Sequence, residues 1–133
     1  MLSLIIVGVL VGLLGFSAYV RLAPSDPVVW HKMPKGLKTG NFINSAVREI
    51  EGNAAVFETL NQVIASSDRT AVLAGSLEEG MVTYVTRSAL MKYPDYTTIK
   101  LLDGKILLYG RARFGRKDFG ANTQRIDAWL AQL

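Results

Sequence analysis

The side chains best suited to chemistry in this 133-residue chain are cations and tyrosines in its C-terminal part. Between Lys105 and Arg125 the chain carries six cations and a single acid, Asp118. Guanidinium groups hold phosphate or carboxylate groups through paired hydrogen bonds, and tyrosines add hydroxyl donors and stacking faces. We therefore expect a surface that binds an anionic lipid headgroup or another acidic ligand, made by Tyr96, Tyr109, Arg111 and Arg113.

The same charges also allow a structural interpretation. The arginines could lie on a solvated face, or they could pair with Asp95 and Asp118 inside the domain. Asp118 is placed to cap the last helix by accepting backbone N–H groups. The sequence leaves the binding and the structural interpretations open.

Catalysis and cofactor chemistry have little support in the sequence. The chain has no cysteine, and its only histidine, His31, lacks the companions that a metal site or a catalytic triad needs. GxSxG, HExxH and P-loop motifs are absent as well. We expect no cofactor and no metal, and we favour a binding or structural module. The alternative is an enzyme of unidentified reaction that uses Arg111, Arg113 and Asp118.

Nucleic acid is a disfavoured partner. The chain has a net charge of +4, but it carries no recognised nucleic-acid-binding motif. An N-terminal segment that could tether the chain to a bilayer disfavours this partner further.

A hairpin positions the cationic residues. Asp103-Gly104 predicts a two-residue turn, because both residues tolerate a positive φ. Pairing across this turn places Tyr96 opposite Arg111 on one face of a sheet. The other face then carries apolar and small residues against which a helix can pack closely, namely Ile99, Leu101, Ile106, Leu108, Gly110, Ala112 and Phe114.

The remaining elements follow from periodicity and turn residues. Two amphipathic helices and a second hairpin are predicted over residues 53–66, 126–133 and 70–88. Residues 42–51 are mixed in character and are assigned to neither helix nor strand. The expected fold is therefore α+β, a four-stranded antiparallel sheet with helices packed on one face, preceded by one transmembrane helix.

The N-terminal segment is apolar enough to cross a membrane. Residues 2–20 carry no charge, and a helix of that length covers roughly 28 Å, close to the ~30 Å hydrocarbon core of a bilayer. A signal peptide is the alternative, but no cation precedes the run and the run is longer than an h-region. Gly8 and Gly12 form a GxxxG pattern, the spacing that lets two helices meet in a homodimer.

The cationic run and three other motifs resemble a known family. They are Arg111-Ala-Arg-Phe-Gly-Arg-Lys-Asp-Phe-Gly-Ala-Asn122 with Arg125, Arg87-Ser88, Tyr93-Pro-Asp-Tyr96, and Ser25-Asp-Pro27 followed by Trp30-His31. In this order they resemble domain-of-unknown-function family fourteen-ninety-nine, over roughly residues 22–133, and its bacterial, membrane-anchored members. The resemblance implies no reaction. It marks five motif residues as structural or functional, namely Asp95, Asp118, Gly120, Asn122 and Arg125.

The chain departs from the family pattern at four positions. Members commonly have serines flanking the first arginine, where this chain has Gly110 and Ala112. Lys117 stands where a serine is usual, and Thr123 replaces a frequent arginine. A role that used those hydroxyl groups would be absent here, and the remaining arginine and carboxamide groups suit an anion.

These observations predict three segments and a location. Residues 1–21 would be a transmembrane anchor, residues 22–40 a Pro-rich juxtamembrane linker, and residues 41–133 a soluble domain. The lipid bilayer, contacted through residues 2–20, would be the first partner. The resemblance points to a single-pass protein of a bacterial inner membrane, and the cations after the span favour the cytoplasmic side for the domain.

Overall fold

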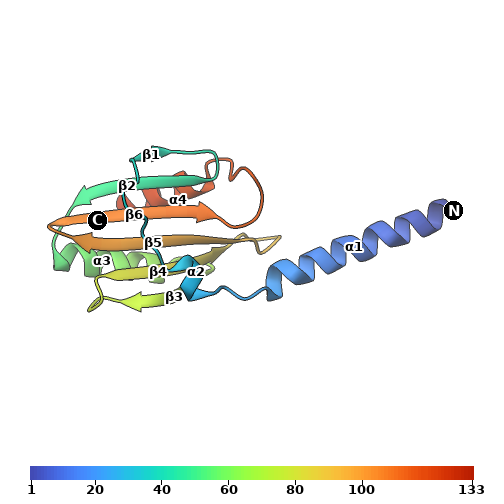
Figure 1. Cartoon of the computed structure of the whole chain (residues 1–133), viewed down its shortest axis with the longest axis horizontal. Coiled ribbons are helices and arrows are strands. Elements are labelled where there is room, and N and C mark those ends of the chain that lie inside the picture. The colour runs from blue at the N-terminus through green and yellow to red at the C-terminus, as the bar shows by residue number, and fades with distance from the viewer.

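The computed structural model describes all residues from 1 to 133, as a long N-terminal helix joined to one sheet-based domain (Figure 1). Six antiparallel strands form the sheet, in the order β1-β2-β6-β5-β4-β3. The prediction of a four-stranded sheet is therefore wrong. The elements are α1 (Leu2–Leu22), α2 (Pro27–Trp30), β1 (Gly40–Asn41), β2 (Ser45–Glu51), α3 (Ala54–Ala65), β3 (Thr70–Ser76), β4 (Met81–Arg87), β5 (Pro94–Leu102), β6 (Lys105–Ala112) and α4 (Ala121–Leu130).

The two strands that the prediction missed, β1 and β2, come from the segment of mixed character. In β2 the neighbouring residues Ala46 and Val47 are both buried, although they face opposite sides of the sheet. Both faces are covered at this point, so the alternation of apolar and polar residues that marks a one-sided strand is lost. Arg48 adds a charge to the helix-covered face, where its Nε donates to Asp127 Oδ1 of α4 at 2.9 Å.

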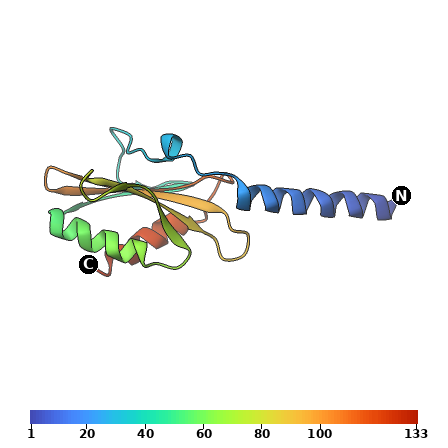
Figure 2. The same ribbon diagram turned by 90° about the horizontal axis from the view of Figure 1, so that it is seen from below.

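Helices α3 and α4 lie together on one face of the sheet, as predicted (Figure 2). Their apolar residues recur at helical spacing and complete a core with β4, β5 and β6, made by Phe57, Leu60, Ile64, Tyr84, Ile99, Ile106, Leu108, Ile126 and Trp129. Helix α3 has Asn53 as its N-cap, and the Asn53 side chain accepts the backbone N–H of Val56 at 3.1 Å.

The predicted hairpin register is confirmed. Leu102 pairs with Lys105 across a turn in which Asp103 and Gly104 have φ values of 52° and 76°. Tyr96 lies opposite Arg111. The second predicted hairpin forms as β3 and β4, which pair across the turn at residues 77–80.

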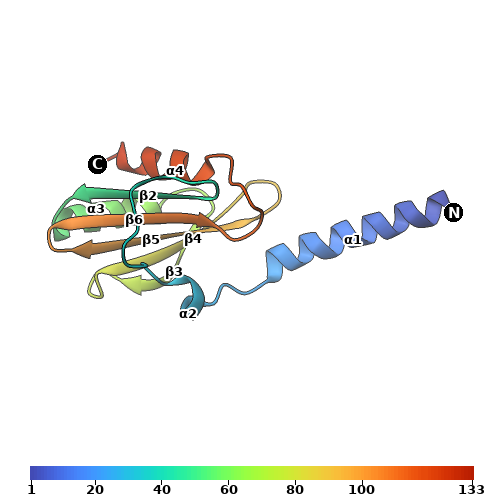
Figure 3. The ribbon, with the colours of Figure 1, turned by 45° about the horizontal axis from the view of Figure 1, so that its top comes forward.

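The face opposite the helices is covered by the chain between α1 and β1. We call residues 24–31 the strap. Figure 2 shows α2, which belongs to the strap, on the side of the sheet away from α3 and α4. From α2 the chain crosses in front of β5 and β6 to reach β1, as Figure 3 shows.

Helix α1 is long and apolar enough to cross a membrane, and a signal sequence near the N-terminus would meet the same criteria. Its last turns are fixed to the domain. Val20 is fully buried, and Arg87 Nη1 donates to its carbonyl oxygen at 3.2 Å. The rings of Phe16 and Tyr19 meet Phe114 edge to face, with centroids 6.3 and 5.9 Å apart. Nothing approaches Gly8 or Gly12, so the homodimer stays a prediction.

Candidate functional site

The residues singled out from the sequence lie on two opposite faces of the sheet. Strand alternation turns Tyr96 and Arg111 toward the strap and Asp95 toward the helices. We call the first group the strap-face cluster, which comprises Tyr96, Tyr109, Arg111 and Arg113. We call the second the helix-face cluster, which comprises Asp95, Asp118, Asn122 and Arg125.

Arg111 is the buried cation at the centre of the strap-face cluster. Its side chain donates to Thr98 Oγ1 at 2.8 Å, to the Tyr109 carbonyl at 3.2 Å and to the Trp30 carbonyl. The guanidinium carbon also lies 4.7 Å from the centre of the Tyr109 ring. No carboxylate pairs with it, and burial lowers the pKa of Arg111 to about 10. Neutral acceptors and aromatic rings therefore hold this charge.

The strap covers this cluster. Trp30 stacks on Tyr96 with the ring centroids 4.1 Å apart, and Tyr96 is fully buried. The Tyr96 hydroxyl shares a hydrogen bond of 2.7 Å with Ser25 Oγ. Arg113 Nη1 donates to the Pro24 carbonyl at 2.9 Å and to the Tyr96 hydroxyl at 3.1 Å. Of the predicted anion-binding residues, Tyr96 and Arg111 are thus buried, whereas Tyr109 and Arg113 are partly exposed, and an anion could reach Arg111 only after the strap had moved.

His31 holds the far end of the strap. Its Nδ1 lies 2.8 Å from Thr83 Oγ1 and its Nε2 lies 2.9 Å from Glu79 Oε1. The imidazole thus joins the strap to β4 and to the β3–β4 turn. These contacts give the only histidine of the chain a structural role.

In the helix-face cluster, the Asp118 carboxylate accepts hydrogen bonds at the start of α4. Its carboxylate accepts the backbone N–H groups of Gly120 at 2.9 Å and Asn122 at 3.1 Å, and the Asn122 side-chain amide at 2.9 Å. The helix begins at Ala121, so the N-cap position belongs to Gly120, which has a left-handed φ of 78°. Asp118 thus accepts backbone N–H groups at the start of the helix, as predicted, but it does so from two residues before the N-cap position.

Asp118→Ala should lower the free energy of unfolding by about 0.5–2 kcal/mol, because it leaves two backbone N–H groups without their acceptor. Asp118→Asn should lower it less, since the amide oxygen can still accept one of them. Urea denaturation of both variants measures the difference. Equal losses would show that the negative charge matters more than the capping geometry.

Asp95 is the carboxylate of the helix-face cluster that has spare hydrogen-bonding capacity. Its Oδ2 accepts Arg125 Nη1 at 3.2 Å and Asn122 Nδ2 at 3.4 Å, whereas its Oδ1 accepts no hydrogen bond from the protein. Burial raises the pKa of Asp95, the ion pair with Arg125 opposes this rise, and the charge of Asp118 adds to it. The negative charge of Asp95 is therefore incompletely balanced by its surroundings.

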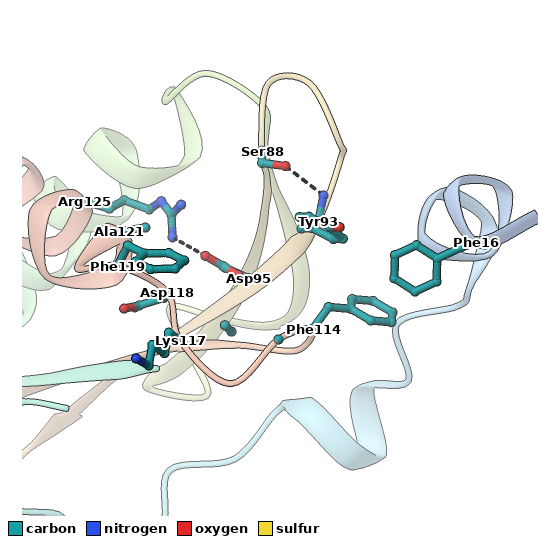
Figure 4. A pocket seen from close by; sticks show the side chains of 12 residues that line it. Phe16, Ser88, Tyr93, Asp95, Phe114, Lys117, Asp118, Phe119, Ala121 and Arg125 are labelled. Carbon is teal, nitrogen blue, oxygen red and sulfur yellow. Dashed lines mark hydrogen bonds and ion pairs between the residues drawn. The ribbon is translucent and has the colours of Figure 1, made fainter. Parts of the chain in front are cut away.

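The helix-face cluster borders a pocket of about 580 Å³ (Figure 4). Aromatic side chains from α1 and from two loops form one side of this pocket, namely Phe16, Tyr93 and Phe114, whereas Phe119 lies beside Arg125. Asp95 and Arg125 stand on the other side, joined by their ion pair. The sequence motifs point to both acids and to Arg125, but no local pattern indicates that Phe16, nearly eighty residues away from Asp95, completes the pocket.

The structure does not bring Arg111 and Arg113 together with Asp118. The two arginines contact the strap, whereas the Asp118 carboxylate is bound to the start of α4 on the other side of the sheet. Asp95 and Asp118 do come together, because the side-chain amide of Asn122 donates to both. The sequence does not reveal this proximity, since more than twenty residues separate the two acids.

Comparison with known proteins identifies a family for this chain. A sequence model described as "Protein of unknown function (DUF1499)" matches residues 22–133. No curated protein matches the chain. A solved structure of a DUF4468 family protein from Bacteroides ovatus ATCC 8483 aligns with a TM-score of 0.37 and 11% sequence identity, over 66% of this chain and 63% of that one. The chain thus covers less than two thirds of that protein, and a similarity this low supports no further statement.

Proposed function

We propose that this chain, which belongs to the DUF1499 family of proteins of unknown function, is a membrane-anchored module that binds anionic lipid headgroups. The binding surface is the end of the domain next to α1. Two loops form it, residues 88–93 between β4 and β5 and residues 113–120 between β6 and α4. Figure 1 places both loops at the end of the sheet where α1 joins the domain.

The observation that carries the proposal is a pair of exposed apolar side chains in these loops, one in each. Leu90 is 80% exposed and Phe119 is 88% exposed. Phe119 also has a left-handed φ of 53°, a conformation that a bulky residue adopts only when its neighbours impose it. Within the domain neither side chain gains much burial, so an apolar environment outside the protein explains their placement best.

The cations in and near these loops suit the headgroup layer. Arg21, Arg116 and Lys117 are exposed, and Lys92 is partly exposed. Near an anionic membrane surface each such charge contributes about 1 kcal/mol of attraction. The two acids at this end, Asp95 and Asp118, are outnumbered by these four cations together with Arg125, which pairs with Asp95.

The attachment of α1 to the domain fixes the position of this surface relative to the hydrocarbon core. Phe16 packs on Phe114, and it lies four residues before Val20, which is roughly 6 Å of helix rise. If residues 2–20 cross the hydrocarbon core, Phe114 must lie within roughly 6 Å of the boundary between acyl chains and headgroups. The buried Val20 keeps the domain from swinging away.

Spin labels test the proposal cleanly, because the chain has no cysteine and each introduced one is unique. Full-length Leu90→Cys and Phe119→Cys are labelled in vesicles that contain phosphatidylglycerol. We expect oxygen, which concentrates in the acyl region, to relax both labels more strongly than a water-soluble nickel chelate does. Leu102→Cys is the control, since it is an exposed leucine at the opposite end of the sheet, and it should show the reverse order.

Two outcomes would contradict the proposal in different ways. Labels at positions 90 and 119 that are as open to the nickel chelate as the label at 102 would mean that the loops stay in water. Release of the chain from membranes by alkaline carbonate would mean that α1 is not a retained span. The double variant Arg116→Glu/Lys117→Glu should move both labels outward, whereas Lys105→Glu, at the far end, should leave them unchanged.

A further inference from the structure

We infer that the pocket beside the helix-face cluster holds one lipid molecule with a primary-amine headgroup, whose ammonium group lies against Asp95. This inference rests on the proposed function, because it needs the pocket to lie at the bilayer surface. It goes further in assigning a separate site and one headgroup chemistry. The exposed cations attract an anionic bilayer as a whole, whereas the pocket selects a single molecule.

The aromatic side of the pocket suits an acyl chain. Phe16 belongs to α1, so the pocket wall is continuous with the apolar surface of that helix. Tyr93 packs between Phe16 and Phe114, with centroids 6.4 and 6.2 Å from theirs. A lipid chain lying along α1 could therefore enter the pocket without crossing water. A volume of about 580 Å³ fits a headgroup and the start of its chains.

The polar side of the pocket has a defined set of free hydrogen-bonding atoms. Both oxygens of Asp118 accept hydrogen bonds from backbone N–H groups, but Asp95 Oδ1 accepts no protein hydrogen bond. In Arg125 only Nη1 is used, by Asp95 and Asn122, so Nε and Nη2 are free to donate. None of these free atoms is sealed from solvent. The pocket can thus bind a group that donates to a carboxylate beside a group that accepts from a guanidinium.

The charges around the pocket indicate which ligand group donates a hydrogen bond to Asp95. The helix-face cluster contains two carboxylates and one guanidinium, and the other charged residue that lines the pocket, the exposed Lys117, forms an ion pair with neither carboxylate. The pKa of Asp95 is raised by burial, and more weakly by the nearby Asp118, despite the ion pair with Arg125, so the carboxylate lacks part of the positive charge that would stabilise it. A primary ammonium supplies that charge and up to three N–H donors, whereas a quaternary ammonium has no N–H group. The adjoining phosphate would then face Arg125.

The test compares two lipids that differ only in three methyl groups on nitrogen. Full-length protein is equilibrated in detergent with dioleoyl phosphatidylethanolamine or dioleoyl phosphatidylcholine, and retained lipid is counted by native mass spectrometry. We expect one phosphatidylethanolamine per chain, retained about tenfold more strongly than phosphatidylcholine, the difference that one charge-assisted hydrogen bond makes. Equal retention of the two lipids would overturn the inference.

Three variants separate recognition from folding. Asp95→Asn should reduce retention of phosphatidylethanolamine to the level of phosphatidylcholine, and Asp103→Asn, in the distant β5–β6 turn, should not change it. Ala121→Leu fills the pocket without altering a charge, and it should prevent retention even if Asp95→Asn folds poorly. Preferential retention of phosphatidylglycerol would refute the amine-headgroup assignment while leaving the proposed binding of anionic bilayers intact.

Discussion

Gly110→Val should lower the free energy of unfolding by about 1–3 kcal/mol or more, the usual range for overpacking a tight interior. A Cβ atom at this position would lie 2.8 Å from Asn122 Oδ1 and 2.9 Å from Ile126 Cδ1. Both neighbours belong to α4, so the helix must move away from β6. Because Asn122 also donates to Asp95, this movement should disturb the helix-face cluster as well.

Thermal and urea denaturation of the full chain in detergent measure the effect. Ala71→Val is the matched control, since it places the same β-branched side chain at an exposed position on the edge strand β3. The control should be close to neutral. If Gly110→Val were equally neutral, α4 would not be held as closely against the sheet as the structure places it.

Trp30→Ala should destabilise the domain by about 2 kcal/mol, because one aromatic stack and two cation–π contacts each contribute roughly 0.5–2 kcal/mol. The indole ring stacks on Tyr96, and the guanidinium carbons of Arg111 and Arg113 lie 5.7 and 6.0 Å from its centre. Its loss should loosen the strap as a unit. Val28→Ala, an exposed position in the same short helix, is the control and should change stability little.

The same variant tests the anion site that the sequence predicts. With the strap loosened, Arg111 should become accessible, and inorganic phosphate should raise the melting temperature of Trp30→Ala but not that of the unchanged chain. The increase should shrink as salt rises, since exposed charges are screened. If the variant has a lowered melting temperature that phosphate does not raise, the strap-face cluster has a structural role alone.

The β5–β6 hairpin could be predicted because its information is local. Asp103-Gly104 specifies the turn, the turn specifies the register, and the register places Tyr96 opposite Arg111. Burial on that face could not be predicted, because it depends on a segment more than sixty residues earlier in the chain. The prolines of residues 22–40 correctly argue against a long helix, but they say nothing about what the segment packs against.

The helix-face cluster shows a similar limit. The family motifs identify Asp95, Asp118, Asn122 and Arg125 without indicating that they form one hydrogen-bonded group. Asn122 joins them, and its position depends on α4 packing over Gly110. The pocket needs Phe16 in addition, a residue that the sequence presents as one more apolar position in a membrane span. Distant contacts of this kind leave no periodic signal in the chain.

The direction of the strands has a consequence for access. They run roughly along the axis of α1, and β5 has nine residues, so the Asp103-Gly104 turn lies about 30 Å beyond the α1 end of the sheet. If α1 crosses a bilayer, the domain stands upright on it. A molecule diffusing in the aqueous compartment would then meet the hairpin tip first, whereas a molecule confined to the lipid leaflet could reach only the foot of the domain. Height above the membrane would thus separate two groups of ligands, one soluble in water and one confined to the lipid leaflet, and the two groups would contact different residues.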